Sequence, residues 1–523
     1  MIAQVALAMP LKPDLPPGST NYSIIVDATN FSADNLIMGQ RLEAAALHVT
    51  ATPQGFQFKG DVKIAGAAAY MEYHQARNDP QADIRLKGTL DASARKSLGL
   101  DPGETINGSV PMRIVGRVGT DSDREGRFSI DADLTSAKID GFLPGWVKPA
   151  GKPAHVSMTL TTQPQSVRID DLVIAGAGTG DGVKGSIELD SDGNLQSANF
   201  QSYGFSDGDN ATLKADRAPD GALRVVMRGD IYDGRGFIKT MTGAPPAGGA
   251  GAPSAASRKA PDVDLDIKLG AVLAFNGEAL SDVDLKMSRR AGEIRSLGFS
   301  SKIGHDGTLT GELQGQASGR QTVILRTTDA GALFRATDVY KRITGGQMTM
   351  VMEAPSGSNP TQQGTLNVRN FGVHDESELQ RAASGGAQNP AAQMSGADLQ
   401  FTSMRVDFTR APGRIALRDG VVRGPMLGGT MDGLIDYTRR SVNLRGTLVP
   451  LYGANNMFGW IPVVGPILGG DKEGLVGFTY EVVGQPGNPV LNVNFFSVLA
   501  PGVLRKIFEF PAATDSVTLD DQH

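Results

Sequence analysis

Cysteine is missing from the 523 residues of this chain. Without thiols the chain has no disulfide scaffold, no thiolate metal site and no cysteine nucleophile, and its composition is compatible with an oxidising compartment. Histidine is scarce and scattered, with no HExxH motif or other close pairing, so the sequence gives no indication of a histidine metal site. The six histidines are His48, His74, His155, His305, His374 and His523.

Long apolar runs are also missing. No segment reaches the roughly 18 uninterrupted apolar residues of a membrane-spanning helix, and residues 1–18 have no basic region before their short apolar run. We therefore expect neither a signal segment nor a transmembrane segment in this chain. An excess of positive charge is absent too, because the net charge is -6 and the pI is about 5.6, so nucleic acid is not an expected partner.

Two stretches resemble site motifs without meeting their requirements. GDGVKG, residues 180–185, has the letters of a dinucleotide fingerprint, but a strand-like segment follows it and not the helix that phosphate binding needs. ELDSDGN, residues 188–194, resembles a calcium loop, but Leu195 stands where that loop needs glycine. Both are interpreted as turns. We predict no catalytic, cofactor-binding or metal-binding residues, and no enzymatic activity.

The chain does contain much glycine, 66 residues, and a period-two alternation of apolar and polar residues. Glycine suits tight turns, and the alternation is typical of β-strands with one apolar and one polar face. The two clearest runs place on one face Val263, Leu265, Ile267 and Leu269, and Leu223, Val225 and Met227. Turn signals separate the runs, at Asp192-Gly193, Asp207-Gly208, residues 219–221, Asp306-Gly307 and Asp419-Gly420.

Only short helices are predicted, at residues 91–98, 329–337 and 375–383. In the last, Asp375 and Glu378 have the spacing of a capping box. Since a ladder of roughly 30 strands at about 4.8 Å each would extend on the order of 140 Å, the sheet must curl or split. The expected fold is mainly β, a long curled antiparallel sheet with a few short capping helices.

Two Ala/Gly/Pro/Ser-rich stretches interrupt the pattern. Residues 242–261 are expected to form a flexible linker or loop, and residues 383–396 a loop. The expected segments are residues 1–118, 119–241 and 262–382, which are β structure, residues 397–496, a C-terminal β region, and residues 497–523, an amphipathic helix and tail.

The C-terminal part contains an apolar loop and a short amphipathic helix. Residues 457–468 are too short to span a bilayer and are broken by Pro462 and Pro466, so core packing and contact with a membrane surface both stay open. An indole favours an interface between apolar and wet surroundings. The membrane-contact candidates are Trp460, Ile461, Val463, Val464, Ile467 and Leu468 in the loop, and Val503, Leu504, Ile507 and Phe508 on one helix face.

Four blocks of sequence, in order, carry a resemblance to a known family. They are TDAGALFRATDVYKRITGGQMTM (residues 328–350), LRDGVVRGPMLGGTMDGLIDY (417–437), GTLVPLYGANNMFGWIPVVGPILGG (446–470) and NVNFFSVLAPGVLRKIF (492–508). The chain resembles the AsmA-like envelope proteins of Gram-negative bacteria, in particular the C-terminal portion of the YhdP-like branch. It departs from that family in lacking the N-terminal transmembrane helix and in having NFFS at residues 494–497, where Asn-Pro-Leu-Ser is expected.

The resemblance implies a function as well as a fold. It implies that the sheet forms an elongated apolar groove for phospholipid acyl chains, which bridges the inner and outer membranes through the periplasm and supports outer-membrane lipid homeostasis. The groove candidates are the seven residues of the two alternating runs, and the C-terminal end would contact a membrane surface. Inner-membrane or other envelope proteins are possible partners, and the intact protein would be membrane-associated.

Two other functions remain open. A periplasmic scaffold or assembly factor for outer-membrane proteins would use the same strands as a closed, dry core. A surface or secreted β-solenoid enzyme would need a cluster of carboxylates in a cleft. Period-two alternation by itself does not separate a groove-facing strand from one packed in a closed sandwich.

Overall fold

The computed structural model of the protein describes residues 2–8, 21–37, 40–64, 66–97, 105–119, 125–140, 147–176, 182–241, 262–315, 321–355, 361–384, 398–450, 477–495 and 497. Of these residues 72% lie in strands and 8% in helices, so the expectation of a mainly β chain with few short helices is confirmed. The large sheet is not closed. The described residues up to Asp233 form one compact unit, unit 1, and those from Gly234 onward form a second, unit 2.

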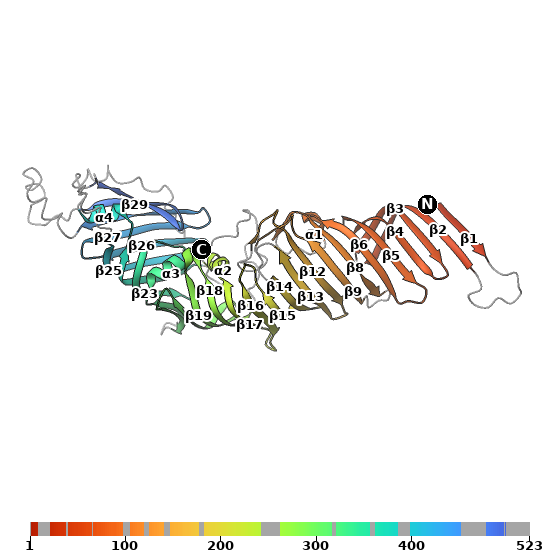
Figure 1. Cartoon of the computed structure of the whole chain (residues 1–523), viewed down its shortest axis with the longest axis horizontal. Coiled ribbons are helices and arrows are strands. Elements are labelled where there is room, and N and C mark those ends of the chain that lie inside the picture. The colour runs from red at the N-terminus through yellow and green to blue at the C-terminus, as the bar shows by residue number, and fades with distance from the viewer. Residues whose placement is uncertain are drawn as a thin grey trace, which may run out of the picture. The chain divides into compact units, whose positions relative to one another are not determined.

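Unit 1 is an antiparallel ladder in which each strand pairs with its neighbours in chain order (Figure 1). Its strands are β1 (Ile2–Ala8), β2 (Asn21–Ile37), β3 (Gln40–Thr52), β4 (Gly55–Ile64), β5 (Ala67–Ala76), β6 (Gln81–Leu90), β8 (Val110–Gly119), β9 (Gly126–Asp133), β12 (Ala154–Thr162), β13 (Ser166–Gly176), β14 (Val183–Asp190), β15 (Leu195–Tyr203), β16 (Asn210–Arg217) and β17 (Leu223–Asp233). A separate 3-stranded sheet contains β7 (Ile106–Asn107), β10 (Lys138–Asp140) and β11 (Val147–Lys148).

In unit 2, consecutive strands also form antiparallel pairs. Its strands are β18 (Val263–Leu273), β19 (Ala279–Arg290), β20 (Glu293–Ile303), β21 (Gly307–Gly315), β22 (Gln321–Thr327), β23 (Ile343–Glu353), β24 (Gln362–Val373), β25 (Leu399–Ala411), β26 (Arg414–Arg423), β27 (Leu427–Asp436), β28 (Ser441–Pro450), β29 (Phe478–Gln485) and β30 (Asn488–Asn494).

Alternation in the sequence becomes alternation in burial along the strands. In β9, Phe128, Ile130 and Ala132 are buried, while Arg127 and the other intervening residues are exposed. The exposed face carries cross-strand ion pairs, such as Arg85 with Glu72 at 3.6 Å. Such exposed pairs stabilise a protein by at most about 1 kcal/mol each, so they set which face meets water more than they hold the sheet together.

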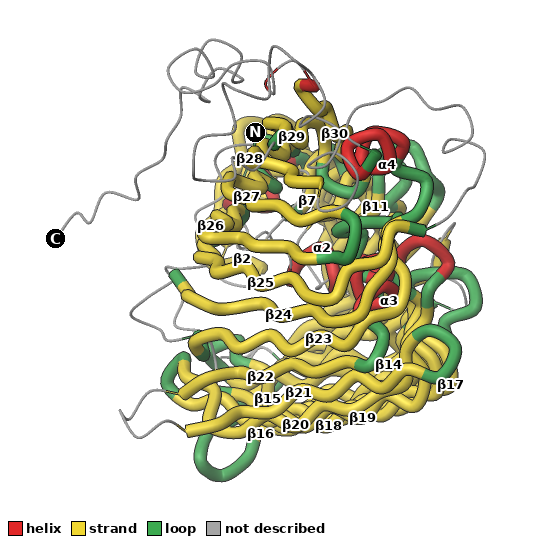
Figure 2. The backbone as a smooth tube through the Cα atoms, turned by 90° about the vertical axis from the view of Figure 1, so that its left-hand side faces the viewer, coloured by secondary structure: helices red, strands yellow, loops and turns green. Residues whose placement is uncertain are grey.

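The three predicted helices are present as α1 (Ala92–Ser97), α3 (Ala330–Ala336) and α4 (Ser377–Ala383). A further helix, α2 (Arg235–Met241), and a 3₁₀ turn at Phe275–Gly277 were not predicted. The carboxylate of Asp329 accepts the N–H of Ala332 at 2.9 Å and so begins α3. In unit 2, α3 packs against β23 and α4 against β28 and β30, and both helices lie at one end of the strands (Figure 2).

The predicted capping box at α4 is wrong. Glu376 is the residue that precedes the helix, and its side chain makes no capping hydrogen bond. Glu376 is buried, so its carboxylate needs strong partners, and it accepts the hydroxyl of Tyr340 at 2.8 Å and pairs with Arg342 at 2.6 Å. Asp375 adopts a left-handed conformation with φ 53° and lies outside the helix. Tertiary partners therefore decided how this helix begins.

The predicted turn at Asp419-Gly420 is also wrong, because both residues lie inside β26. The pairing with β27 shifts between Leu417 and Gly420, which is a β-bulge. Asp419 has φ 51°, and its N–H donates to the carboxylate of Asp432 at 2.8 Å. A left-handed aspartate followed by glycine absorbs the shift without reversing the chain. The other four turn signals lie at connections between consecutive strands, as predicted, although Gly307 of the last one is already the first residue of β21.

The two predicted loops fall almost wholly outside the described residues. Residues 242–261 and 385–396 are not described, while Ala383 ends α4 and Ser384 follows it. The expected segment boundaries stay predictions.

A buried aspartate ties the turn between β15 and β16 to the end of β17. The side chain of Asp209 is 5% exposed, and its carboxylate accepts three backbone N–H groups, those of Phe205 at 2.8 Å, Ser206 at 2.9 Å and Asp233 at 2.7 Å. A carboxylate that accepts several backbone N–H groups stabilises the local backbone conformation strongly, since hydrogen bonds to charged groups are stronger than those between neutral groups.

We predict that Asp209→Ala lowers the free energy of unfolding of unit 1 by about 3 kcal/mol, because three N–H groups lose their acceptor. Urea denaturation followed by circular dichroism measures the change. Asp207→Ala is the matched control, since Asp207 is exposed in the same turn, and its effect should stay within about 0.5 kcal/mol. Equal shifts in the two variants would contradict the assigned role of Asp209.

Candidate functional site

Directly opposed residues of an antiparallel pair project from the same face, so the register reveals which side chains form rows across the sheet. In unit 1 one row crosses the whole ladder from β1 to β17, and its only polar side-chain atom is a tyrosine hydroxyl. The row consists of Ala3, Val26, Val49, Phe58, Tyr73, Ile84, Gly116, Phe128, Leu160, Ile169, Ile187, Ala198, Ala215 and Val225. We name it the unit 1 row.

Unit 2 has two such rows on one face. The first runs from β18 to β25 and consists of Ile267, Leu285, Phe299, Gly311, Leu325, Met350, Leu366 and Val406. The second runs from β21 to β30 and consists of Leu313, Val323, Met352, Gly364, Phe408, Leu417, Gly433, Leu444, Val482 and Leu491. These are the first and second unit 2 rows. Neither contains a polar side chain.

Much of the apolar surface of these rows is only partly covered. Leu160, Ile169 and Ile187 of the unit 1 row are half-buried. Val323 and Phe408 of the second unit 2 row are half-buried as well. Other members are buried, among them Ile84 and Phe128 in unit 1 and Val406 in unit 2, so the exposed apolar surface of each row is not continuous. Apolar surface that stays exposed on a protein often marks a binding surface.

Helices cover one margin of the face in unit 2, where Phe299 and Leu325 of the first unit 2 row pack against the cluster beneath α3, while row members such as Val323 and Phe408 are half-buried. Ile303 and Leu309, which pack against Ala332 and Ala336 of α3, are 1% and 3% exposed. The short helices therefore act as covers for the ends of strands, since a helix of two turns is too small to shield a row that crosses many strands.

The structure divides the seven predicted groove residues between the two units. Val263, Leu265, Ile267 and Leu269 share one face of β18 in unit 2, where Ile267 begins the first unit 2 row and Leu269 is buried. Leu223, Val225 and Met227 share one face of β17 in unit 1, where Val225 ends the unit 1 row and Met227 is buried. All ten membrane-contact candidates lie outside the described residues.

Sequence reasoning missed most row positions, and glycine and alanine above all. Gly116, Gly364 and Ala198 are row members because of their partners, not because of their own side chains. The signal that identifies them is the pairing register, which alternation within one strand does not give.

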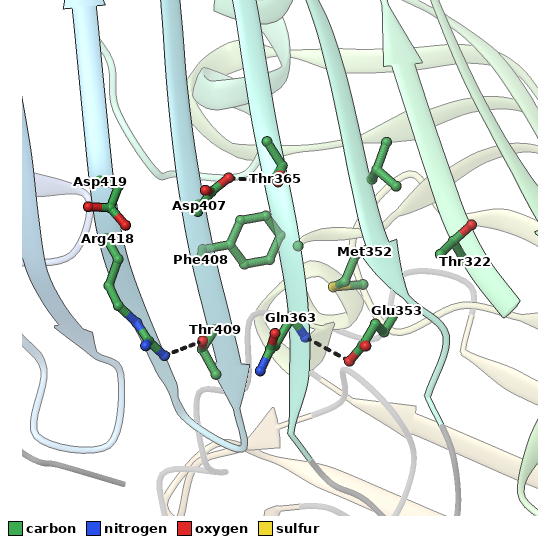
Figure 3. A pocket seen from close by; sticks show the side chains of 12 residues that line it. Thr322, Met352, Glu353, Gln363, Thr365, Asp407, Phe408, Thr409, Arg418 and Asp419 are labelled. Carbon is green, nitrogen blue, oxygen red and sulfur yellow. Dashed lines mark hydrogen bonds between the residues drawn. The ribbon is translucent and has the colours of Figure 1, made fainter. Parts of the chain in front are cut away.

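A hollow of about 420 Å³ lies in unit 2 over β22 to β26 (Figure 3). Most of its lining residues alternate with the second unit 2 row, but Met352, Gly364 and Phe408 of that row line it as well. Its polar groups bind one another, as when Thr365 Oγ1 donates to Asp407 Oδ1 at 2.7 Å and Arg418 Nη2 donates to Thr409 Oγ1 at 2.8 Å. This polar hollow does not suit an acyl chain.

The two motif-like stretches are turns or strands where the structure describes them. Residues 180–185 are interpreted as a turn before a strand, but Val183 already begins β14, so the strand starts three residues earlier than expected. The carboxylate of Asp190 accepts the N–H groups of Asn194 at 2.7 Å and Asp192 at 3.0 Å, and the hydrogen bonds of Asn194 hold the pKa of Asp190 below its usual value. This is a hairpin turn. Within the described ranges, no group of three or more His, Asp or Glu side chains is placed to hold a metal ion.

None of the described helices has the length and apolar character needed to cross a membrane. Comparisons of the chain with protein-family models, with curated proteins and with solved structures find no match.

Tyr203 lies on the apolar face of unit 1, where its direct strand partner is Val183, and its ring contacts Phe205 edge-on with centroids 5.1 Å apart. Burial raises the pKa of Tyr203 to about 12, because ionisation would place a charge in apolar surroundings. The folded state thus holds this proton more tightly than the unfolded state does.

We predict a loss of stability at alkaline pH that depends on Tyr203. Its contribution is fully present below pH 10, the ordinary pKa of tyrosine, and is lost as the pH rises toward 12. The slope for this one group is about 1.4 kcal/mol per pH unit in that window. Urea midpoints measured across the window should fall less steeply for Tyr203→Phe than for the wild type. Tyr70→Phe, at an exposed position, is the control, and an unchanged slope in Tyr203→Phe would contradict the prediction.

Proposed function

We propose that this chain is a non-enzymatic lipid-transfer protein that holds phospholipid acyl chains along its apolar rows. The observation that carries the proposal is the unit 1 row, which crosses every strand of the large sheet in unit 1, from β1 to β17, without a polar side chain apart from the hydroxyl of Tyr73. An acyl chain is the common cellular ligand that matches a long, half-buried apolar strip and needs no polar partner along its length.

Such a row can bind an acyl chain and still let the chain slide along it. Each methylene that leaves water for an apolar environment gains about 0.8 kcal/mol, so a chain of many methylenes is held well. The charged headgroup stays in water, because burying it without partners is costly. Since neighbouring positions of the row are chemically alike, a chain that moves by one strand exchanges one apolar contact for another, and no nucleophile or cofactor is required.

The groove itself is part of the proposal. An open sheet that curls around the acyl chain would form an elongated apolar groove, and the short helices would cap it at the strand ends. In line with the family resemblance, we propose that the groove lies in the periplasm and bridges the inner and outer membranes. Trp460 and the other membrane-contact candidates would then bring the C-terminal end to a membrane surface.

Mass spectrometry of organic extracts from the purified full-length chain tests the proposal. The expected result is phospholipid in stoichiometric amount. A folded chain without lipid would overturn the proposal and would favour the scaffold or assembly function, which uses the same strands as a dry core.

A charge within a row should displace the lipid, while a charge on the opposite face should not. We predict that Ile187→Lys lowers lipid occupancy at least about tenfold, because an unpaired ammonium in the row costs well over 1.4 kcal/mol in the lipid-bound state. Glu188→Lys is the matched control, since Glu188 is the exposed next residue of β14 and points to the other face. Similar occupancies in the two variants would count against the assigned face.

The same reasoning applies to β18 in unit 2, where a charge at Leu265 or Ile267 should reduce lipid occupancy more than Asp264→Lys does. The carboxylate of Asp264 accepts two hydrogen bonds from Arg290, at 2.8 and 2.9 Å, so its replacement also removes an ion pair. Thermal unfolding of each variant separates this loss of stability from a loss of lipid. Equal lipid loss in all three variants would argue against the face assignment in unit 2.

A further inference from the structure

Aromatic residues on the apolar face repeatedly stand directly opposite glycines. Of these pairs, Gly116 with Phe128 belongs to the unit 1 row, Gly311 with Phe299 to the first unit 2 row, and Gly364 with Phe408 to the second. Two further pairs, Gly185 with Phe200 and Gly446 with Tyr480, lie beside the rows on the same face.

In most of these pairs the ring occupies the space that a side chain on the glycine would need. A Cβ atom added to Gly364 would lie 2.5 Å from Cζ of Phe408, and one added to Gly116 would lie 2.7 Å from Cδ1 of Phe128. The corresponding distance is 2.8 Å both from Gly185 to Cδ1 of Phe200 and from Gly446 to Cε1 of Tyr480. Figure 3 shows the ring of Phe408 turned toward the neighbouring strand, which carries Gly364.

This arrangement lowers the aromatic side chains toward the sheet. Side chains usually stand roughly perpendicular to a sheet, and an aromatic ring would then rise above its aliphatic neighbours. Opposite a glycine the ring lies over the backbone of the next strand and also shields that backbone from water. The half-buried ring of Phe408 therefore adds apolar surface to its row without standing across it, while Phe128 lies low enough to be buried.

We propose that the glycine–aromatic pairs set the clearance above the apolar rows, so that a straight acyl chain passes over Phe128 and Phe408 without being blocked. This inference rests on the proposed function and adds to it the residues that determine which ligand fits. An unbranched acyl chain fits a low, level strip, whereas a ring raised by a bulkier partner residue obstructs it. Gly364 and Phe408 are positioning residues of the second unit 2 row.

The test uses the full chain and cis-parinaric acid, a straight-chain fatty acid that fluoresces when bound. We expect Gly364→Ala to weaken its binding about tenfold, equivalent to about 1.4 kcal/mol, because the added methyl group lifts the ring of Phe408 into the path. Gly298→Ala is the matched control. A Cβ at Gly298 meets nothing within 4 Å, and Gly298 is an exposed residue of β20 that points to the face opposite the first unit 2 row.

A double variant separates clearance from backbone strain. A Cβ at Gly364 also lies 2.7 Å from the carbonyl oxygen of Val351, so strain alone would weaken binding whatever residue 408 is. If clearance is the cause, Gly364→Ala combined with Phe408→Ala restores most of the binding. A double variant as weak as the single one, or a Gly364→Ala variant that binds like the wild type, would overturn the inference.

Two further outcomes are decisive. If Gly364→Ala does not fold, Phe408→Trp poses the same question with a larger ring, and wild-type binding by that variant would overturn the inference. Failure of the wild-type chain to bind cis-parinaric acid would instead overturn the proposed function itself. Binding by the wild-type chain therefore tests the proposed function, and binding by the variants tests the clearance hypothesis.

Discussion

The register of antiparallel pairing is the constraint on which the rest of this structure depends. Side chains alternate between the two faces of a strand, so a slip of one residue in any pairing would turn every later row from one face to the other. The ladders of both units contain bulges that absorb irregular residues, and several of them hold an aspartate or asparagine in the left-handed conformation. Asp171 and Asp419 are examples, with φ of 52° and 51° at shifts in the pairing of β13 with β14 and of β26 with β27. Each bulge adds its residue locally, and the apolar rows continue beyond it.

The two faces that result contribute in different ways. The polar face carries ion pairs such as that of Arg326 with Glu312 at 2.6 Å, which are exposed and add little to stability. Stability comes from the backbone ladder and from the apolar clusters, including the one in which Met71 and Leu42 are fully buried. Half-buried residues such as Ile187 lie between these extremes. Leaving apolar side chains partly exposed forgoes burial energy of about 25 cal/mol per Å², and an apolar ligand would recover it.

To bind such a ligand, the protein must supply a long apolar surface of suitable shape, and it needs few specific polar or reactive groups. The rows offer continuity across strands, and the glycine–aromatic pairs offer a level surface. The polar hollow beside Asp407 and Arg418 borders the second unit 2 row, because Met352, Gly364 and Phe408 of that row also line it. The short helices close the strand ends, as α3 does over Ile303 and Leu309. These features are mutually consistent with the proposed lipid transfer, which the family resemblance alone first suggested.

Local features of this protein were determined by the sequence itself. The alternation in β18, the hairpin turn at Asp190 and the helix that begins after Asp329 all depend on residues within a few positions of one another, so a single stretch of sequence contains the necessary information. Features that involve distant residues were decided only by the tertiary structure. The helix start at Glu376 depends on Tyr340 and Arg342, and the place of Gly364 in a row depends on Met352 and Phe408. A glycine has no side chain to give a periodic signal, and only strand pairing, which joins residues far apart in the chain, places it beneath an aromatic ring.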